Sequence, residues 1–365
     1  MGERLFNGSR FAETTVSVEE TLSQGDPVED ILQIGDRLER YQPLLDTATS
    51  RFIMEMEEIE KRCSNGGENP EDLLRAVNGE IDKMMHHCAQ FEKETGSAEA
   101  VRNARVAFHE KTNPILSKSY CIHRTRTWPQ GHQGDYKTLE YAYRNTPLSH
   151  GIGYYLDLYL LNLPLAHAVR NRIKKLEVLL GDEIRKRTNP SLMNVGCGSC
   201  RELMGITPEI CTSSAKITCV DTDNDALAFA QDRLSYAGLM PQVELRKYNA
   251  LRMFDDETNE HEFGKQDIIY SVGLFDYLPS DFLTKLFAAL YRLLNPGGKL
   301  IAAFKDADTY RSQDYHWIVD WDGFLQRTKK DFREIMAGAG IPSEAISETS
   351  IESGVIVFYT MTQLT

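Results

Sequence analysis

From Pro190 onward, short apolar runs alternate with segments of helical pattern, and this alternation is the feature that most restricts the fold of the chain. Strands that alternate with helices build a parallel sheet whose two faces are covered by the helices. A last apolar run at 354–361 follows the turn-forming sequence Glu-Ser-Gly, which predicts an antiparallel strand. The other strands are expected over 191–195, 216–220, 242–247, 266–272 and 299–304.

Before Pro190 helical patterns dominate. Apolar residues recur at three- and four-residue steps over 28–63, where Pro43 predicts a break or a new start. A second helix is capped by Asn69, and a third runs from Ser97 to about residue 112, where an Asn-Pro pair interrupts it. These segments predict a helical bundle over about 28–118, preceded by some 25 residues that form a loose arm.

The chain therefore divides into a helical N-terminal domain, 1–150, and a sheet domain, 151–365, whose leading helices are bent at Pro164. The connector at 124–150 is rich in aromatic and polar residues for a mere linker. Since loops held by a scaffold often carry function, we predict that it forms a lid over the ligand site. The alternative is a strap between domains. The lid residues expected to face the substrate are Tyr136, Tyr143, Arg144 and Asn145.

Composition excludes several classes of protein. The net charge of −13 disfavours nucleic acid as a partner, and basic clusters such as Arg170 and Arg172 have the pattern of solvated helix faces. No apolar run reaches the length of a membrane span, and charges interrupt the N-terminus where a signal peptide would need an apolar core. We therefore expect a cytoplasmic protein without a membrane partner.

Seven scattered cysteines form no disulfide framework. Cys197 and Cys200 make a C-x-x-C pair, which could be a redox pair or half of a zinc site. No second pair completes a tetrahedral set, so we expect small residues in a tight loop and no metal.

That loop is "NVGCGSC", residues 194–200, between the first predicted strand and its helix. Gly196 and Gly198 allow a sharp turn and the close approach of a ligand. The second strand ends in Asp221, 23 residues after Gly198, where a dinucleotide-binding unit places its ribose-binding acid. At this point NAD and S-adenosylmethionine (SAM) fit equally well.

Two further segments favour SAM. The sequence "KYNAL" (247–251) is similar to an adenine-contacting turn, and "LLNPGGKLIAAF" (293–304) resembles the turn into strand five of class I SAM-dependent methyltransferases. The order of motifs over about 185–361 is the order of that family. Two positions depart from it, because Asn194 replaces the usual acid before the first glycine and Cys200 replaces the usual third glycine.

The resemblance implies a Rossmann-like seven-stranded methyltransferase sheet preceded by an all-α N-terminal domain, with SAM as the cofactor and S-adenosylhomocysteine (SAH) as its product. The chain also looks like a bacterial group of small-molecule methyltransferases with a helical N-terminal region, one branch of which is associated with methyl esters of hydroxy fatty acids. The residues expected to bind the cofactor are Asn194, Gly196, Cys197, Gly198, Asp221, Thr222, Asn249, Ala250, Ser271 and Gly273.

Acceptor residues are expected beyond the ends of strands four and five, where open α/β sheets bind ligands. Each could instead be structural: the two tryptophans at 317 and 321 could pack one helical face, and a histidine is more often a structural partner than a base. The catalytic candidates are Asp276, Tyr277, His316 and Asp320. The substrate candidates in this region are Lys305, Asp306, Tyr315, Trp317 and Trp321.

The sequence thus predicts a methyltransferase that acts on the nitrogen or oxygen of a small metabolite. Acids outnumber bases in the predicted mouth, which slightly favours an amine or guanidine acceptor such as an arginine-like amino acid. The alternatives are a carboxyl O-methyltransferase of a hydroxy fatty acid, a catalytically inactive SAM-binding module and a nicotinamide oxidoreductase. The long amphipathic helices could also form a homodimer.

Overall fold

The computed structural model describes residues 27–364, with side chains from residue 34. The loose arm expected for the first 25 residues lies outside this range. The chain forms two compact units: the first comprises the chain up to Leu163 together with Arg311–Asp322, and the second comprises Pro164–Tyr310 and Gly323–Thr365. No helix in the described part of the chain is both long and apolar enough to cross a membrane.

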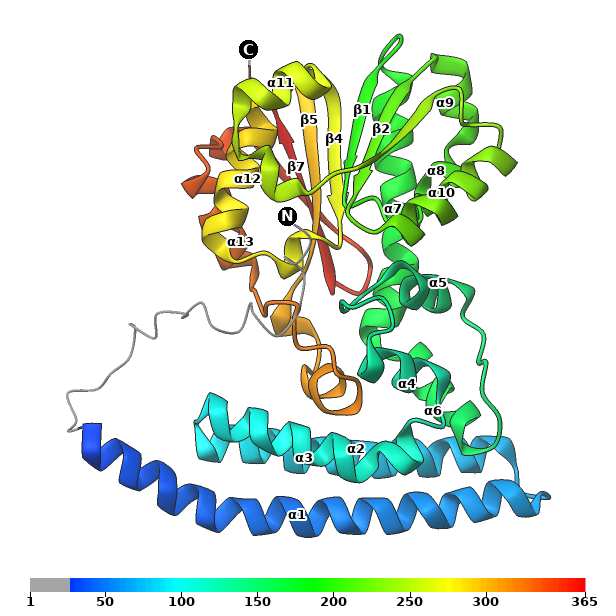
Figure 1. The fold of residues 1–365 in the computed structure, drawn as a ribbon, viewed down its shortest axis with the longest axis vertical. Helices are drawn as coiled ribbons and strands as arrows, with labels where there is room; N and C mark the ends of the chain where they lie inside the picture. The colour runs from blue at the N-terminus through cyan, green and yellow to red at the C-terminus, as the bar shows by residue number, and fades with distance from the viewer. Residues whose placement is uncertain (1–26, 365) are drawn as a thin grey trace, which may run out of the picture. The chain divides into compact units, whose positions relative to one another are not determined.

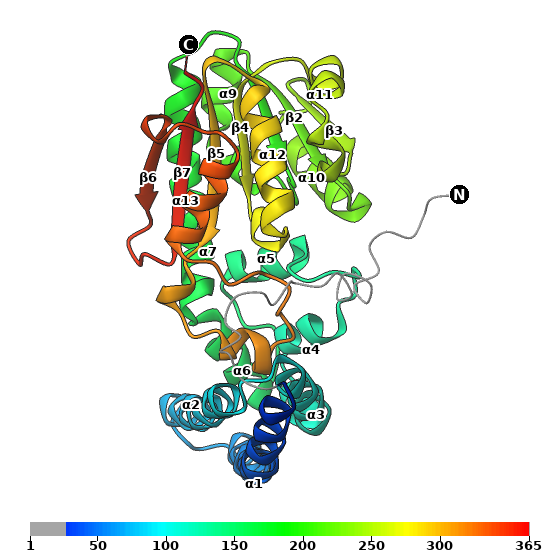
Figure 2. The same cartoon turned by 90° about the vertical axis from the view of Figure 1, so that its left-hand side faces the viewer.

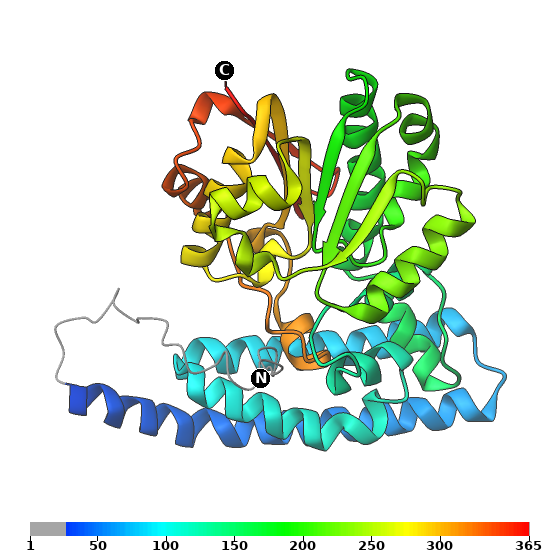
Figure 3. The same cartoon turned by 45° about the horizontal axis from the view of Figure 1, so that its top comes forward.

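Three long helices, α1 (Pro27–Asn65), α2 (Pro70–Thr95) and α3 (Ala98–Leu116), lie side by side in the first unit (Figures 1 and 3). The predicted break at Pro43 is wrong, because α1 continues through it. Likewise, α3 runs through Pro114 to Leu116. A proline removes one backbone hydrogen bond from a helix, and here the packing of long neighbouring helices outweighs that loss.

The first unit also contains α4 (Tyr120–Thr127), α5 (Tyr136–Arg144) and α6 (Ile152–Leu161). Helix α6, which the sequence grouped with the sheet domain, packs against α2 and α4, and its nearly all-round apolar sequence is mostly buried as expected. A π-helical turn, η5 (Asp314–Ile318), contributes the buried Trp317 to the same core.

The second unit is a seven-stranded sheet with the strand order β3-β2-β1-β4-β5-β7-β6. The first five strands are parallel and β7 is antiparallel to β5, so the predicted Rossmann-like methyltransferase sheet is confirmed. The seventh strand, β6, was missed because its sequence, ISETS, is polar and only partly buried. The strands are β1 (Ser191–Val195), β2 (Lys216–Asp221), β3 (Val243–Lys247), β4 (Gln266–Val272), β5 (Leu294–Lys305), β6 (Ile346–Ser350) and β7 (Ile356–Thr362).

Helices cover both faces of this sheet. Helices α12 (Ser280–Arg292) and α13 (Lys329–Gly338) lie on one face, and α7 (Pro164–Arg185) and α9 (Thr207–Ser213) lie on the other (Figure 2). The apolar core under α12 and α13 contains alternate strand residues such as Met193 and Ile269. On each strand, the residues that alternate with these core residues point to the opposite face of the sheet, as the two-residue period of a strand requires. The remaining helices are α8 (Arg201–Gly205), α10 (Asn224–Tyr236) and α11 (Asp256–Phe263).

Candidate active site

The strand order reverses at β1, which is hydrogen-bonded to β2 on one side and to β4 on the other. Open α/β sheets bind ligands at such a switch point, outside the carboxyl ends of the strands. The loop that leaves β1 there has three residues in the left-handed region: Gly196 (φ 71°), Gly198 (φ 52°) and Cys200 (φ 49°). Cys200 therefore occupies a conformation that normally favours glycine, which accounts for the family preference at this position.

Hydrogen bonds hold the loop in this shape. The Asp221 carboxylate, at the end of β2, accepts from the backbone N–H of Gly198 at 2.7 Å and from that of Asp223 at 3.0 Å. From α10, Arg233 donates to the carbonyl of Ser199 at 2.9 Å. Asp221 thus organises the loop in addition to any contact with a ribose.

The backbone and neighbouring polar groups of the loop leave room for contact with a ligand. A Cβ placed on Gly198 would meet nothing within 4 Å, so the backbone is open to close approach. After the end of β3, the Asn249 side chain accepts from the Leu251 N–H at 2.9 Å and forms a tight turn at the buried Ala250. At the end of β4 the Ser271 hydroxyl is buried and has no hydrogen-bond partner among the described residues. Of the other predicted cofactor residues, Cys197 is buried and Thr222 is exposed.

A row of buried polar side chains lies behind the loop on the face opposite the α12–α13 core. Cys219, Asn194 and Tyr270 are register neighbours on β2, β1 and β4. Glu202 of α8 closes the row: its Oε1 accepts from Asn194 Nδ2 at 2.9 Å and from the Tyr270 hydroxyl at 2.8 Å. Burial, with a further contribution from Cys200, raises the pKa of Glu202 to about 8.

The cysteines of the loop belong to this buried cluster. The thiols of Cys197, Cys200 and Cys219 are within hydrogen-bonding reach of one another, and all three are free. Over residues 27–364, no group of three or more His, Cys, Asp or Glu residues is arranged to hold a metal ion.

Asp276, a predicted catalytic residue, is engaged in a buried ion pair. Its Oδ2 accepts from Lys305 Nζ at 2.5 Å, and both side chains are more than nine-tenths buried. The desolvation of Lys305 lowers its pKa, and the attraction of Asp276 opposes that effect. Neither group is thus presented to a substrate as a single charge. Asp306 is also buried and caps its own turn by accepting from Asp308 N–H, while Tyr277 is half-buried with its ring 5.6 Å from Lys305 Nζ.

Arg172 is a candidate site residue that sequence reasoning missed, because it was taken as part of a solvated face. It is only 4% exposed, and its Nη1 lies 3.4 Å from the position of a Cβ on Gly273, at the end of β4. The signal was available: Arg172 occurs at helical spacing from Leu165, Ala168 and Leu176, all of which are buried. A charged residue in the apolar stripe of a helix indicates a specific partner for its charge.

The remaining acceptor candidates belong to the first unit. Trp317 is fully buried, donates from Nε1 to Glu92 at 2.8 Å and packs edge-on against Phe91 and Phe108, which makes it a core residue and not a substrate contact. Tyr315 is also buried, and burial lowers the pKa of His316.

Asp320 and Trp321 do line a small hollow within this unit, whose volume of about 10 Å³ is room for one water molecule. Trp128 and the Arg124–Asp135 ion pair form other parts of its lining. The Asp320 carboxyl accepts no hydrogen bond from the described residues, and burial together with Asp322 raises its pKa to about 6.

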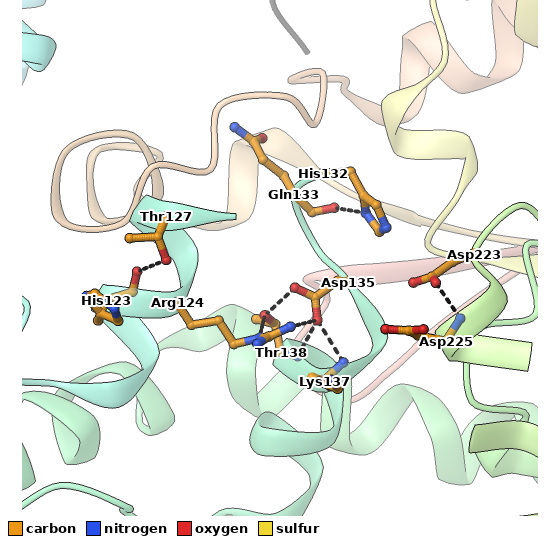
Figure 4. A network of polar contacts seen from close by, with 10 residues as sticks. All are labelled: His123, Arg124, Thr127, His132, Gln133, Asp135, Lys137, Thr138, Asp223 and Asp225. Atoms are coloured by element: carbon orange, nitrogen blue, oxygen red, sulfur yellow. Dashed lines mark hydrogen bonds and ion pairs between the residues drawn. The ribbon is translucent and has the colours of Figure 1, made fainter. Parts of the chain in front are cut away.

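The predicted lid contains a short helix that the sequence did not predict. Asp135 caps α5 by accepting from the N–H groups of Lys137 and Thr138, and it binds Arg124 at 2.7 Å (Figure 4). Tyr136 is buried and Tyr143 half-buried, whereas Arg144 and Asn145, at the end of the helix, are exposed.

In the second unit, the Asp223 side chain caps α10 by accepting from the Asp225 N–H at 2.8 Å (Figure 4).

Comparison with known proteins agrees with this geometry. Residues 192–298 match the family model described as a methyltransferase domain. A stretch of 111 residues is 27% identical to an uncharacterized protein of Haemophilus influenzae; it covers 30% of this chain and only 40% of that relative. The structure of a possible exported protein from Bordetella parapertussis is similar over 88% of this chain and 97% of that one, with a TM-score of 0.54 and 16% identity. That of the magnesium protoporphyrin IX methyltransferase of Synechocystis PCC 6803, with bound SAH, is similar over 55% of this chain and 87% of that one, with a TM-score of 0.41 and 13% identity.

The second unit is therefore a methyltransferase domain with the class I fold, the class of SAM-dependent enzymes that the sequence motifs predicted.

Proposed function

We propose that this protein binds SAM at the switch point and transfers its methyl group to a small molecule. One observation carries the proposal: the Asp221 carboxylate holds a loop of left-handed residues open at the end of β1, next to the unpartnered Ser271 hydroxyl at the end of β4. When bound, SAM supplies a methyl group already activated by its sulfonium. The protein's main task is to orient the acceptor toward that methyl group, and orientation is worth roughly 7–11 kcal/mol in well-aligned systems.

We assign the cofactor contacts by chemistry. Asp221 would accept from ribose hydroxyls, and the turn at Asn249 and Ala250 would flank the adenine. Arg172, buried beside Gly273, would hold the cofactor's carboxylate, since a guanidinium is well suited to that group. Asn194 would accept from the ammonium group.

For the acceptor we propose an amine or guanidinium. The support is Asp320, whose carboxyl lies without a hydrogen bond from the described residues in a hollow that Trp128 and Trp321 also line. Aromatic faces and a carboxylate together recognise cations. A carboxylate acceptor would need a basic partner. Of the two basic substrate candidates, Lys305 is neutralised by Asp276 and Arg144 is exposed, so this alternative has less support. The seven free thiols fit a reducing compartment such as the cytoplasm.

The test is incubation of the pure protein with methyl-labelled SAM and a host metabolite extract, followed by mass spectrometry. A labelled cationic product is expected, and Asp320→Asn should lower its yield. Glu99→Gln, which removes an exposed carboxylate of α3, is the control and should not lower it. A labelled acidic product would contradict the proposed acceptor. Titration calorimetry that shows binding of NAD, or no binding of SAM, would contradict the methyltransferase assignment. Binding of SAM without any labelled product would favour an inactive SAM-binding module.

A homodimer through the helical unit remains a prediction. Leu44 and Met54 on α1 are 57% and 62% exposed, which gives it modest support. Light scattering of the purified chain would measure the mass directly.

A further inference from the structure

The buried polar row behind the loop contains a carboxyl group that the assigned cofactor contacts do not use. Glu202 is 7% exposed and has no ion pair with a basic residue among the described contacts. A carboxyl buried in this way costs free energy when it is ionised, unless a cation compensates for it. Its position, one strand-to-helix turn from the proposed cofactor cleft, raises the question of which cation that is.

Asn194 connects Glu202 to the cleft. Its Nδ2 donates to Glu202, which leaves Oδ1 as an acceptor on the other branch of the same amide. Oδ1 accepts no hydrogen bond from the described residues, although Asn194 is only 3% exposed. Oδ1 is not among the fully buried polar atoms of the described residues, so it is open to solvent and can accept from a ligand; the cofactor's ammonium group is such a donor.

We propose that Glu202 is the counter-charge of the bound cofactor: it keeps a proton while the cleft is empty and releases that proton when SAM binds. This inference rests on the proposed function. Glu202 acts through Asn194 and is therefore a positioning residue. It fixes the amide so that Oδ1 accepts from the ammonium group, and its negative charge stabilises the cofactor's cationic centres.

Among the charged and titratable groups around Glu202, we expect Glu202 itself to change its protonation state when a cation binds nearby. One cation, Arg233, faces it from α10, but Arg233 is already engaged with the Ser199 carbonyl. On α7, Glu177 lies beside Gly205 at the far end of α8. The other titratable groups around it are the thiols of Cys197 and Cys200 on the loop and Cys219 on β2, and the hydroxyl of Tyr270 on β4.

SAM carries a sulfonium charge that SAH lacks, so the two ligands should differ in this effect. A unit positive charge in a medium of intermediate dielectric lowers the pKa of a neighbouring carboxyl by about one unit or more. At pH 7 the wild type should therefore release roughly 0.6 of a proton per SAM bound, and less per SAH. Its affinity for SAM should rise roughly ten-fold between pH 6.5 and pH 8.5.

The experiment is isothermal titration of SAM and SAH into the full chain, in buffers of different ionisation enthalpy, which counts the protons released. The cofactor's own amino group titrates in the same range, so the reading is the difference between the wild type and Glu202→Gln. Glutamine keeps the acceptor oxygen for Asn194 and Tyr270 and removes the charge. Glu209→Gln, on α9, removes a partly buried carboxylate that pairs with Arg185; it is the matched control and should release as many protons as the wild type.

A second variant separates charge from shape. Asn194→Asp combined with Glu202→Gln exchanges the carboxyl and the amide while the pair is kept. We expect this double variant to bind SAM at pH 8.5 about ten-fold more tightly than Glu202→Gln alone. Equal proton release from the wild type and Glu202→Gln, or a double variant no tighter than the single one, would overturn the inference while SAM binding itself stands. An absence of SAM binding in the wild type would overturn the proposed function and this inference with it.

Discussion

The buried carboxyl of Glu202 should make the stability of the sheet unit depend on pH, and the Glu202→Gln substitution isolates that dependence. In the folded protein burial raises the pKa of Glu202 to about 8, from an ordinary value of 4.5. The folded state therefore binds the proton more tightly than the unfolded state does. This contribution to stability is fully present below pH 4.5 and is lost as the pH rises through 8.

The size of the effect follows from the two pKa values. For a single group with those values, the contribution to the free energy of unfolding is about 3 kcal/mol at pH 5.5 and close to zero at pH 8.5. The wild type should thus lose about 3 kcal/mol relative to Glu202→Gln over this interval. For a unit of this size that corresponds to a difference of roughly 6–12 °C in melting temperature.

The assay is thermal unfolding of both proteins, without cofactor, at several pH values between 5.5 and 8.5. Near-ultraviolet circular dichroism follows the tertiary structure, and Glu209→Gln controls for the loss of a surface charge. The difference in melting temperature should grow in favour of Glu202→Gln as the pH rises. A difference that stays constant across the range would refute the reasoning, because it would mean that Glu202 is ionised throughout.

Three other substitutions test the site. Asp221→Asn leaves one of two backbone N–H groups facing an amide donor. It should lower the free energy of unfolding by about 1–3 kcal/mol in denaturant and weaken the affinity for SAM at least ten-fold in calorimetry. An unchanged affinity would contradict the role of the loop. Arg172→Met should weaken SAM by about 1.5–3 kcal/mol, measured in the same way, and equal affinity would show that Arg172 does not reach the cofactor. Lys305→Met should destabilise the fold by about 3–5 kcal/mol because it strands the Asp276 carboxylate, whereas the double change with Asp276→Leu should cost much less in urea unfolding; similar costs would argue against a coupled pair.

The sheet could be predicted from the sequence because its strands are buried on both faces and read as apolar runs. The exception, β6, shows the limit: ISETS is polar and half exposed, and only its pairing with β7 makes it a strand. The prolines at 43 and 114 mislead for a related reason. They signal a local break, while the continuity of α1 and α3 depends on packing between helices that no local pattern records.

The site could be predicted only where a residue's position along one strand or loop determined its role. The glycine loop and Asp221 could be placed in this way, since both follow a strand end. By contrast, Asp276 and Lys305 are 29 residues apart, and nothing in either segment shows that the two charges neutralise each other. Trp317 was a substrate candidate because its segment follows β5, yet that segment leaves the sheet unit and joins the helical one.

Asn194 illustrates how a departure from a family pattern can be explained by a distant residue. An aspartate there would place a second carboxylate beside Glu202, where the present contact is 2.9 Å, and two buried carboxylates at that distance cannot both ionise. With asparagine, the pair holds one negative charge at most, and the amide joins that charge to the cleft by a hydrogen bond. The missing acid at the end of β1 is thus supplied from α8, eight residues later in the chain. Asn194 therefore does not remove the negative charge from this part of the site. The charge is carried by Glu202, one hydrogen bond further from the ligand.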